Sequence, residues 1–262
     1  PVGPTDRARV STAMKQAFLT KPSHEWEELF GAAKAPATAQ RFTKEWLDDP
    51  HALASGLVLQ VEDAKHGPMR QMGNVAWLAD DETAAQKSSA VQADLAALLA
   101  EPQRGGDSGQ EGKGWLDGLK VLDLTNVIAG PTIGSTLARY GAEVTLVQPV
   151  EPSVDPWNTV VFGIHAQRGK ESILLNLRTE EGQEALARLI AEADAVTMNG
   201  TDQQRDHLGL HPERLAEINP RLILVQLDAF GGVMRGPKSD HLGYDDLAQA
   251  ATGVMLRFGG GM

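Results

Sequence analysis

Cysteine is absent from the 262-residue chain, which excludes disulfides, thiolate metal sites and cysteine nucleophiles. The sequence also lacks any run of about 18 apolar residues, the length that a transmembrane helix needs. Positive charge is scarce, because 24 Lys and Arg stand against 35 Asp and Glu, for a net charge of −11. Such a chain has little attraction for nucleic acid or an anionic membrane, so we predict neither as a partner. A chain without cysteine suits the cytoplasm, where we expect the protein to reside.

The composition is otherwise that of a folded globular protein, with 42% hydrophobic and 23% charged residues. One stretch differs, because residues 101–114 (EPQRGGDSGQEGKG) contain no large apolar side chain that would offset their ordering entropy. We therefore predict a linker at 101–114 between one piece formed by residues 1–100 and another formed by 115–262. The chain begins Pro-Val-Gly-Pro and ends Gly-Gly-Gly-Met, and we expect both ends to be cuts inside a longer polypeptide.

The piece before the linker is predicted to be smaller and mostly helical. The pattern favours a helix around Met14–Phe18, a second helix capped by Ser23, and a third over Thr43–Leu47 that Asp49-Pro50 stops. A hairpin is expected next, with strands at 57–61 and 74–78 and a turn at His66-Gly67-Pro68. Apolar residues at helical spacing then mark a last helix: Val91, Leu95, Leu98 and Leu99.

The piece after the linker alternates between strands and helices. The predicted strands are 119–125, 143–147, 172–177, 195–198 and 221–227. One predicted helix follows Gly130-Pro131, and a second begins at Thr179. One or two short helices fill the stretch up to Ile218, and a last helix carries the stripe Leu247, Ala250, Ala251 and Val254. This alternation is typical of an α/β fold. We predict a doubly wound, mainly parallel, Rossmann-like sheet over 115–262, with helices on both faces.

In such a sheet, ligands bind at the carboxyl ends of the strands, which directs attention to residues 126–131. Gly130 would let a ligand approach the backbone, and the start of a helix favours phosphate. The stretch is not the G-x-G-x-x-G of NAD sites, and Gln148 stands where an acidic residue would hold a ribose. A plain strand-to-helix turn therefore stays open. The basic turn 167–170, with Arg168 and Lys170, either meets phosphates or is simply solvated.

Other catalytic motifs are missing from the sequence. The histidines have no paired metal-ligand spacing, so we predict no metal site; they are His24, His51, His66, His165, His207, His211 and His241. The acidic run 80–82 reads as a solvated face, and neither G-x-S-x-G nor a Walker loop occurs. From the residues alone, the sequence predicts a ligand that carries phosphate, but no particular reaction.

Several motifs occur together in the order of a known family. They are Leu119–Thr125, Ala129-Gly130-Pro131, Tyr140–Val144, Arg168–Ile173, Ala193–Val196 with Asn199, Leu208-Gly209-Leu210, Ile218–Ile223 and Gly243–Ala250. In this combination the sequence resembles the class III CoA-transferases, the CaiB/BaiF family. The resemblance covers essentially all of 115–262.

The piece before the linker resembles the carboxyl-terminal end of the same family, through Phe18–Trp26 and Trp46–His51. The end of one transferase unit thus precedes the start of another, as in the middle of a tandem, two-unit member. The sequences of 126–133 and 152–158 are similar to those of a tandem member that acts on dimethylsulfoniopropionate, in which a lyase step releases dimethyl sulfide. The resemblance also implies pairing, either as a homodimer or between tandem units.

The resemblance implies that CoA moves from an acyl-CoA donor to a small carboxylate acceptor through an aspartyl intermediate. By the family pattern, the nucleophilic Asp falls beyond Met262, so we expect no catalytic residue in this chain. The ligand is CoA or acyl-CoA, without a metal. Two alternatives remain: α-methylacyl-CoA racemisation, which needs a His where Gly243-Tyr244 stand, and a non-catalytic CoA-binding module.

The resemblance also assigns a CoA site. Ile128 and Ala129 are implied to lie against CoA. The residues implied to line the adenosine and phosphates are Leu175, Asn176, Leu177 and Arg178. Asn199 and Gly200 are implied to contact the pantetheine, and the residues implied to meet the thiol end are Leu242, Gly243, Tyr244, Asp245 and Asp246. The chain departs from the family pattern at three places. Gly200 occurs where the family often has an aromatic residue, and Gln148-Pro149 occur where it often has a basic one. The position of the family's helical Arg corresponds most nearly to His207, with Arg205 close by in the sequence.

Overall fold

The computed structural model describes residues 3–79, 114–151, 156–232 and 234–259, together with Asp94, Ala96 and Ala100. The chain divides into two compact units. The sheet unit is formed by Ala90–Asp228, and the helical unit by Pro1–Ser89 together with Ala229–Met262. The residues that marked the expected helix at 91–99 lie outside the described residues, as does the expected linker except for Gly114.

The sheet unit contains five parallel strands. They are β3 (Lys120–Asp123), β4 (Glu143–Pro149), β5 (Lys170–Leu175), β6 (Ala195–Asn199) and β7 (Ile223–Leu227). Their spatial order is β5-β4-β3-β6-β7, and every neighbouring pair is parallel. The order runs outward in both directions from β3 and β6, which makes this pair the topological switch point where such sheets bind ligands. All five predicted strands are confirmed, and no bound is shifted by more than two residues.

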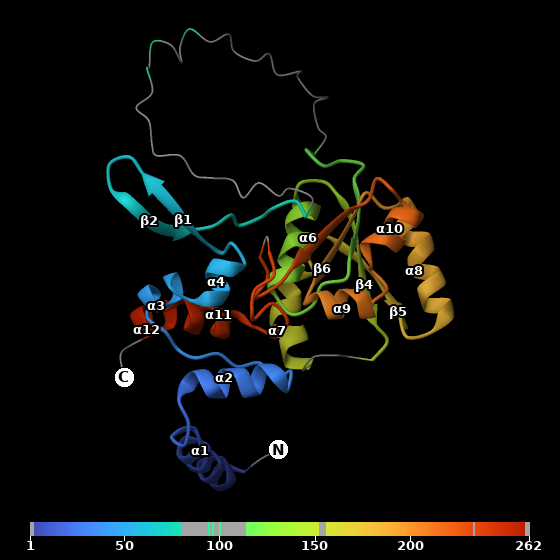
Figure 1. The fold of residues 1–262 in the computed structure, drawn as a ribbon. Coiled ribbons are helices and arrows are strands. Elements are labelled where there is room, and N and C mark those ends of the chain that lie inside the picture. The colour runs from blue at the N-terminus through green and yellow to red at the C-terminus, as the bar shows by residue number, and fades with distance from the viewer. Residues whose placement is uncertain are drawn as a thin grey trace. The chain divides into compact units, whose positions relative to one another are not determined.

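Helices cover both faces of this sheet (Figure 1). They are α6 (Ala129–Arg139), α7 (Pro156–Ala166), α8 (Glu180–Glu192), α9 (Asp202–His207) and α10 (Pro212–Ile218). Successive strand residues point to opposite faces, so Leu122 packs in one core cluster with α8 and α10, whereas Val121 packs in a second cluster with α6. The doubly wound α/β fold is confirmed. The sequence analysis missed α7, which is rich in apolar residues and has no polar stripe that marks a helix.

The helical unit combines both ends of the described chain. Its elements are α1 (Pro4–Phe18), α2 (Ser23–Ala32), α3 (Thr43–Leu47), α4 (Pro50–Ala54), β1 (Val58–Asp63), β2 (Gly67–Met72), α11 (Asp245–Thr252) and α12 (Val254–Phe258). Helix α11 packs against α3, and the backbone N–H of Arg41 donates to the carbonyl of Ala250 over 3.0 Å. Residues 229–259 therefore fold with the N-terminal segment. The predicted tandem boundary at 101–114 concerns transferase units rather than these compact units and stays a prediction.

Three details of the helical unit differ from the sequence analysis. Ser23 is the first residue of α2 rather than its cap, because Pro22 occupies the cap position. Asp49-Pro50 ends α3 but also starts α4, since the Asp49 carboxylate accepts from the N–H groups of the next helix.

The hairpin partner was also wrong. Strand β1 pairs with β2 rather than with 74–78. The turn comes earlier than predicted, because the Asp63 carboxylate accepts from the N–H groups of Lys65 and His66.

Nothing in the described part of the chain forms a helix that is long and apolar enough to cross a membrane.

Candidate functional site

The switch point of the sheet is closed by two asparagines. The Asn126 N–H donates to Oδ1 of Asn199 over 2.8 Å, and Nδ2 of Asn199 donates to the Asn126 carbonyl over 3.3 Å. These bonds join the loop after β3 to the end of β6. Gly130 lies beneath this junction, where a Cβ would come within 2.5 Å of the Thr125 Cβ and 3.1 Å of the Asn199 Cγ. The small residue is therefore required by packing on the strand ends, a reason that the sequence analysis did not anticipate.

The loop between β3 and α6 presents its backbone in an unusual conformation. Val127 has a φ of 67°, which is sparsely populated for a β-branched residue and costs on the order of 1–3 kcal/mol. Ile128 and Ala129 follow at the start of α6, and both are exposed. Such strain is typical of ligand sites, since the surrounding structure must enforce it. The exposed N-terminus of an 11-residue helix here offers N–H groups and a favourable dipole for an anion.

A buried ion pair supports this loop from below. The Lys170 Nζ lies 2.6 Å from Oδ2 of Asp123, and both side chains are at most 1% exposed. The ammonium also donates to the Pro131 carbonyl over 2.8 Å and to Oε1 of Gln167 over 3.0 Å. All three of its protons thus have an acceptor. Both expectations for Lys170 are wrong: its ammonium neither meets a phosphate nor is solvated, because it is paired with Asp123 inside the protein.

The other carboxylate oxygen of Asp123 completes the support. It accepts from the N–H of Thr125 over 2.9 Å, from the hydroxyl of Thr125, and from the hydroxyl of Thr197 over 3.1 Å. The ion pair is therefore fully hydrogen-bonded, which is the condition under which a buried pair is tolerated. It ties β3, β6, the start of α6 and the turn before β5 into one rigid base.

The end of β5 carries the cation most open to a ligand. Arg178 is exposed, and its guanidinium has no ion pair or hydrogen bond to any described residue, Glu180 and Glu181 included. Asn176 fixes the turn, since its Oδ1 accepts from the Arg178 N–H over 3.2 Å. Thr179 then caps α8 through the Gly182 N–H. Leu175 and Leu177 are partly buried and pack against the hydrophobic core.

The end of β6 is less cationic than the family pattern implies. Gly200 has a φ of 140°, and its N–H donates to the Leu227 carbonyl. Arg205 is neutralised by Asp202 at 3.1 Å and Asp206 at 2.7 Å. His207 is exposed at the end of α9. Local positive charge for an anionic ligand therefore comes from elsewhere, with Arg178 and the exposed Arg168 as candidates.

The remaining expected residues, Leu242–Asp246, lie in the helical unit at the start of α11. Tyr244 is 55% exposed, and Asp245 accepts from the side chain of Gln249 over 2.5 Å. Gly243 lies against Phe230, whose Cε2 would be 3.1 Å from a Cβ. The residues expected at CoA in the sheet unit thus all lie at carboxyl ends of strands or directly after them, whereas these five belong to the other unit.

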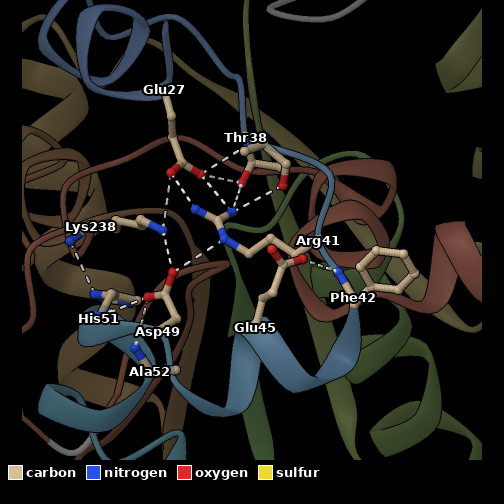
Figure 2. A network of polar contacts seen from close by, with 10 residues as sticks. Glu27, Thr38, Arg41, Phe42, Glu45, Asp49, His51, Ala52 and Lys238 are labelled. Atoms are coloured by element: carbon tan, nitrogen blue, oxygen red, sulfur yellow. Dashed lines mark hydrogen bonds and ion pairs between the residues drawn. The ribbon is translucent and has the colours of Figure 1, made fainter. Parts of the chain in front are cut away.

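A second polar cluster was missed by the sequence analysis. Glu27, Arg41, Asp49, His51 and Lys238 form a buried network within the helical unit (Figure 2). No local spacing reveals it, because Lys238 comes from the far end of the chain. Within the described residues, no group of three or more His, Asp or Glu side chains is arranged to hold a metal ion.

The parallel sheet with helices on both faces defines an α/β protein of the Rossmann-like class. The model of CoA-transferase family III matches residues 4–90 and 116–261. The chain therefore belongs to CoA-transferase family III.

The chain is also similar to individual curated proteins and to solved structures. Over 95% of its length the chain is 40% identical to the CoA-transferase/lyase DddD of Marinomonas sp. (strain MWYL1), of which it spans 31%. Over 56% of its length it is 35% identical to the acetyl-CoA:oxalate CoA-transferase of Acetobacter aceti, of which it spans 39%. A solved CAIB/BAIF family protein from Brucella suis matches 55% of this chain and 40% of its own, with 35% identity and a TM-score of 0.46. The chain thus spans about a third of the length of the curated relatives it matches.

Proposed function

We propose that the chain is part of a class III acyl-CoA transferase, in which CoA passes from an acyl-CoA donor to a carboxylic acid through an aspartyl intermediate. The chain supplies CoA-binding residues at the carboxyl ends of the strands. Ile128 and Ala129 line one part of this edge, Asn176–Arg178 a second, and Asn199-Gly200 a third. Leu242–Asp246 are proposed to meet the thiol end. No metal takes part, and the transferase units pair with one another, in a homodimer or within a tandem chain.

The free guanidinium of Arg178 is the observation that carries this proposal. CoA is strongly anionic and the chain has a net charge of −11, so the long-range field opposes binding and a local cation must outweigh it. Arg178 follows β5 at the ligand edge and is exposed without a partner among the described residues. A charge-assisted bond to phosphate contributes about 1.5–3 kcal/mol. Arg178→Ala should therefore weaken CoA binding by roughly 10- to 150-fold.

Titration calorimetry with CoA tests this prediction. Arg221→Ala is the matched control, because Arg221 is also an exposed arginine but precedes β7 and so lies at the amino end of the strands. The control should bind CoA like the wild type. An unchanged dissociation constant in Arg178→Ala would remove the phosphate role, and equal losses in both variants would show a general charge effect instead.

We further propose that the parent enzyme acts on dimethylsulfoniopropionate and that a lyase step follows the transfer. Identity of 40% over 95% of the chain to a CoA-transferase/lyase supports this choice. The family model matches the two ranges 4–90 and 116–261, which suits a tandem arrangement. The protein that contains this chain, given acetyl-CoA and dimethylsulfoniopropionate, should release dimethyl sulfide into the headspace, detected by gas chromatography. Transfer of CoA without dimethyl sulfide would retain the transferase and exclude the lyase.

A further inference from the structure

The loop that precedes α11 is bound to the N-terminal segment, residues 27–55, through Lys238. The Lys238 Nζ lies 2.8 Å from Oδ2 of Asp49 and 3.2 Å from Oε2 of Glu27, and the side chain is only 13% exposed. Its backbone N–H donates to Nδ1 of His51 over 3.0 Å. Figure 2 shows the ammonium between the two carboxylates, with the imidazole beside the backbone of the same residue. The side chain of Lys238 is thus held by α2 and by the N-cap of α4, and its backbone is held by α4.

The carboxylates that hold Lys238 are kept ionised. Burial alone raises the pKa of Glu27, but hydrogen bonds from Arg41 and Thr38 and the charge of Lys238 outweigh it and lower the pKa to about 2. Burial likewise raises the pKa of Asp49, and the bond and charge of Lys238 lower it overall. Arg41 binds Glu27 at 2.5 Å and Asp49 at 3.4 Å, so two anions face two cations. We call the set of Glu27, Arg41, Asp49, His51 and Lys238 the Lys238 network.

The loop also fits its surroundings sterically. A Cβ on Gly236 would lie 2.5 Å from Nδ1 of His51, and one on Gly31 of α2 would overlap the ring of His241. These glycines allow the loop backbone to lie directly on α4 and the His241 ring to lie on α2. The Met234 N–H adds a bond to the Ser55 carbonyl over 3.3 Å. The loop therefore contacts the N-terminal segment at Met234, Gly236 and His241 as well as at Lys238.

The far end of α11 is held by the same segment. The Arg41 N–H donates to the Ala250 carbonyl, and Gly253, with a φ of 85°, packs where a Cβ would lie 2.8 Å from Oγ1 of Thr43. Helix α11 is thus fixed on both sides by residues between 27 and 55. The start of this helix, with Tyr244 and Asp245, has its place set by a segment far away in the sequence.

We propose that Lys238 is a positioning residue for CoA binding: through the Lys238 network, the N-terminal segment holds Leu242–Asp246 in the conformation that receives the thiol end of CoA. The role of Leu242–Asp246 rests on the proposed function, whereas the network itself does not. The N-terminal segment, which touches no ligand in this account, thereby contributes to the affinity for CoA. Without the network, the segment must be ordered when CoA binds, and the entropy lost in ordering it weakens binding.

Lys238→Met tests this inference, because it keeps the length of the side chain and removes the charge. Hydrogen exchange of the free 262-residue chain should become faster at 242–248 than in the wild type. Lys44→Met, an exposed lysine on α3 of the same unit, should leave exchange there unchanged. Asp49→Asn serves as a second variant in case Lys238→Met does not fold, since it removes the charge facing Lys238 and keeps an oxygen to cap α4. Lys238→Arg should restore protection.

Binding of two ligands separates positioning from general damage. Lys238→Met should weaken CoA binding by roughly 5- to 30-fold, the equivalent of ordering about one residue, and leave the affinity for adenosine 3′,5′-bisphosphate unchanged, because that compound lacks the pantetheine and thiol. Equal losses for both ligands overturn the proposal, and so does unchanged exchange at 242–248 in both variants. If the wild type binds neither ligand, the proposed function fails, while the exchange experiment still decides whether Lys238 holds the segment.

Discussion

Glu27→Gln should destabilise the helical unit at neutral pH and should reduce the loss of its stability at acid pH, although the substitution changes only a few atoms. The Glu27 carboxyl is 5% exposed, and its pKa is lowered from 4.5 to about 2, with the cost of burial outweighed by Arg41, Thr38 and Lys238. A group whose pKa is lower in the folded than in the unfolded state stabilises the fold above its unfolded pKa. That stabilisation is lost as the pH falls from 4.5 towards 2.

The magnitude follows from the size of the pKa difference. The full contribution of Glu27 to the free energy of unfolding is about 3 kcal/mol at neutral pH, of which about 2 kcal/mol is lost by pH 3. Glutamine does not titrate, so the variant should lack this part of the pH dependence. At pH 7, Glu27→Gln should be destabilised by about 3–5 kcal/mol, because Arg41 and Lys238 are left with Asp49 alone.

Urea unfolding at several pH values between 7 and 3 measures both effects, with tryptophan fluorescence as the signal, since Trp26 and Trp46 belong to α2 and α3. Glu28→Gln is the control, because Glu28 is exposed on the same helix. The wild type and the control should lose about 2 kcal/mol more than Glu27→Gln between pH 7 and pH 3. Parallel pH curves for all three proteins would refute the account of the network.

Two further predictions concern the base beneath the loop after β3. Gly134→Ala should destabilise the sheet unit, because the new Cβ would overlap Oδ2 of Asp123 and lie 3.0 Å from Cε of Lys170, whereas Gly163→Ala in α7, with nothing nearer than 3.9 Å, should be neutral or slightly stabilising in thermal unfolding. Lys170→Met should cost about 3–5 kcal/mol in urea unfolding, since it strands the Asp123 charge, and Asp123→Asn combined with Lys170→Met should recover part of that loss; a double variant as unstable as the sum of the two would contradict the pairing.

The sheet and its covering helices were predictable because each element carries its own pattern. The buried strand 195–199 carries the apolar residues Ala195, Val196 and Met198 in a short run, and α8 shows both a capping threonine and an apolar stripe. Helix α7 was missed since its apolar residues surround the helix, and α4 was missed because Asp49-Pro50 serves two helices at once.

The chemistry of the site was less predictable than the fold. Lys170 and Arg178 look alike in sequence, yet one is buried against Asp123 and the other is exposed, and only the packing of β3 beside α6 distinguishes them. The Lys238 network joins residues from both ends of the chain, so no local spacing announces it. Long-range pairing of this kind is set by the tertiary fold, whereas propensity and periodicity report local structure.

The central claim is that CoA binds at the carboxyl ends of the strands. Hydrogen exchange of the 262-residue chain with and without CoA, followed in the sheet unit, tests it most directly. Binding of CoA at the carboxyl ends of the strands should slow exchange at 126–130, 176–178 and 199–200, and leave the opposite edge, at 141–143 and 193–195, unchanged. Slower exchange at the opposite edge alone, or no change anywhere at saturating CoA, would contradict the assignment of this edge as the CoA site.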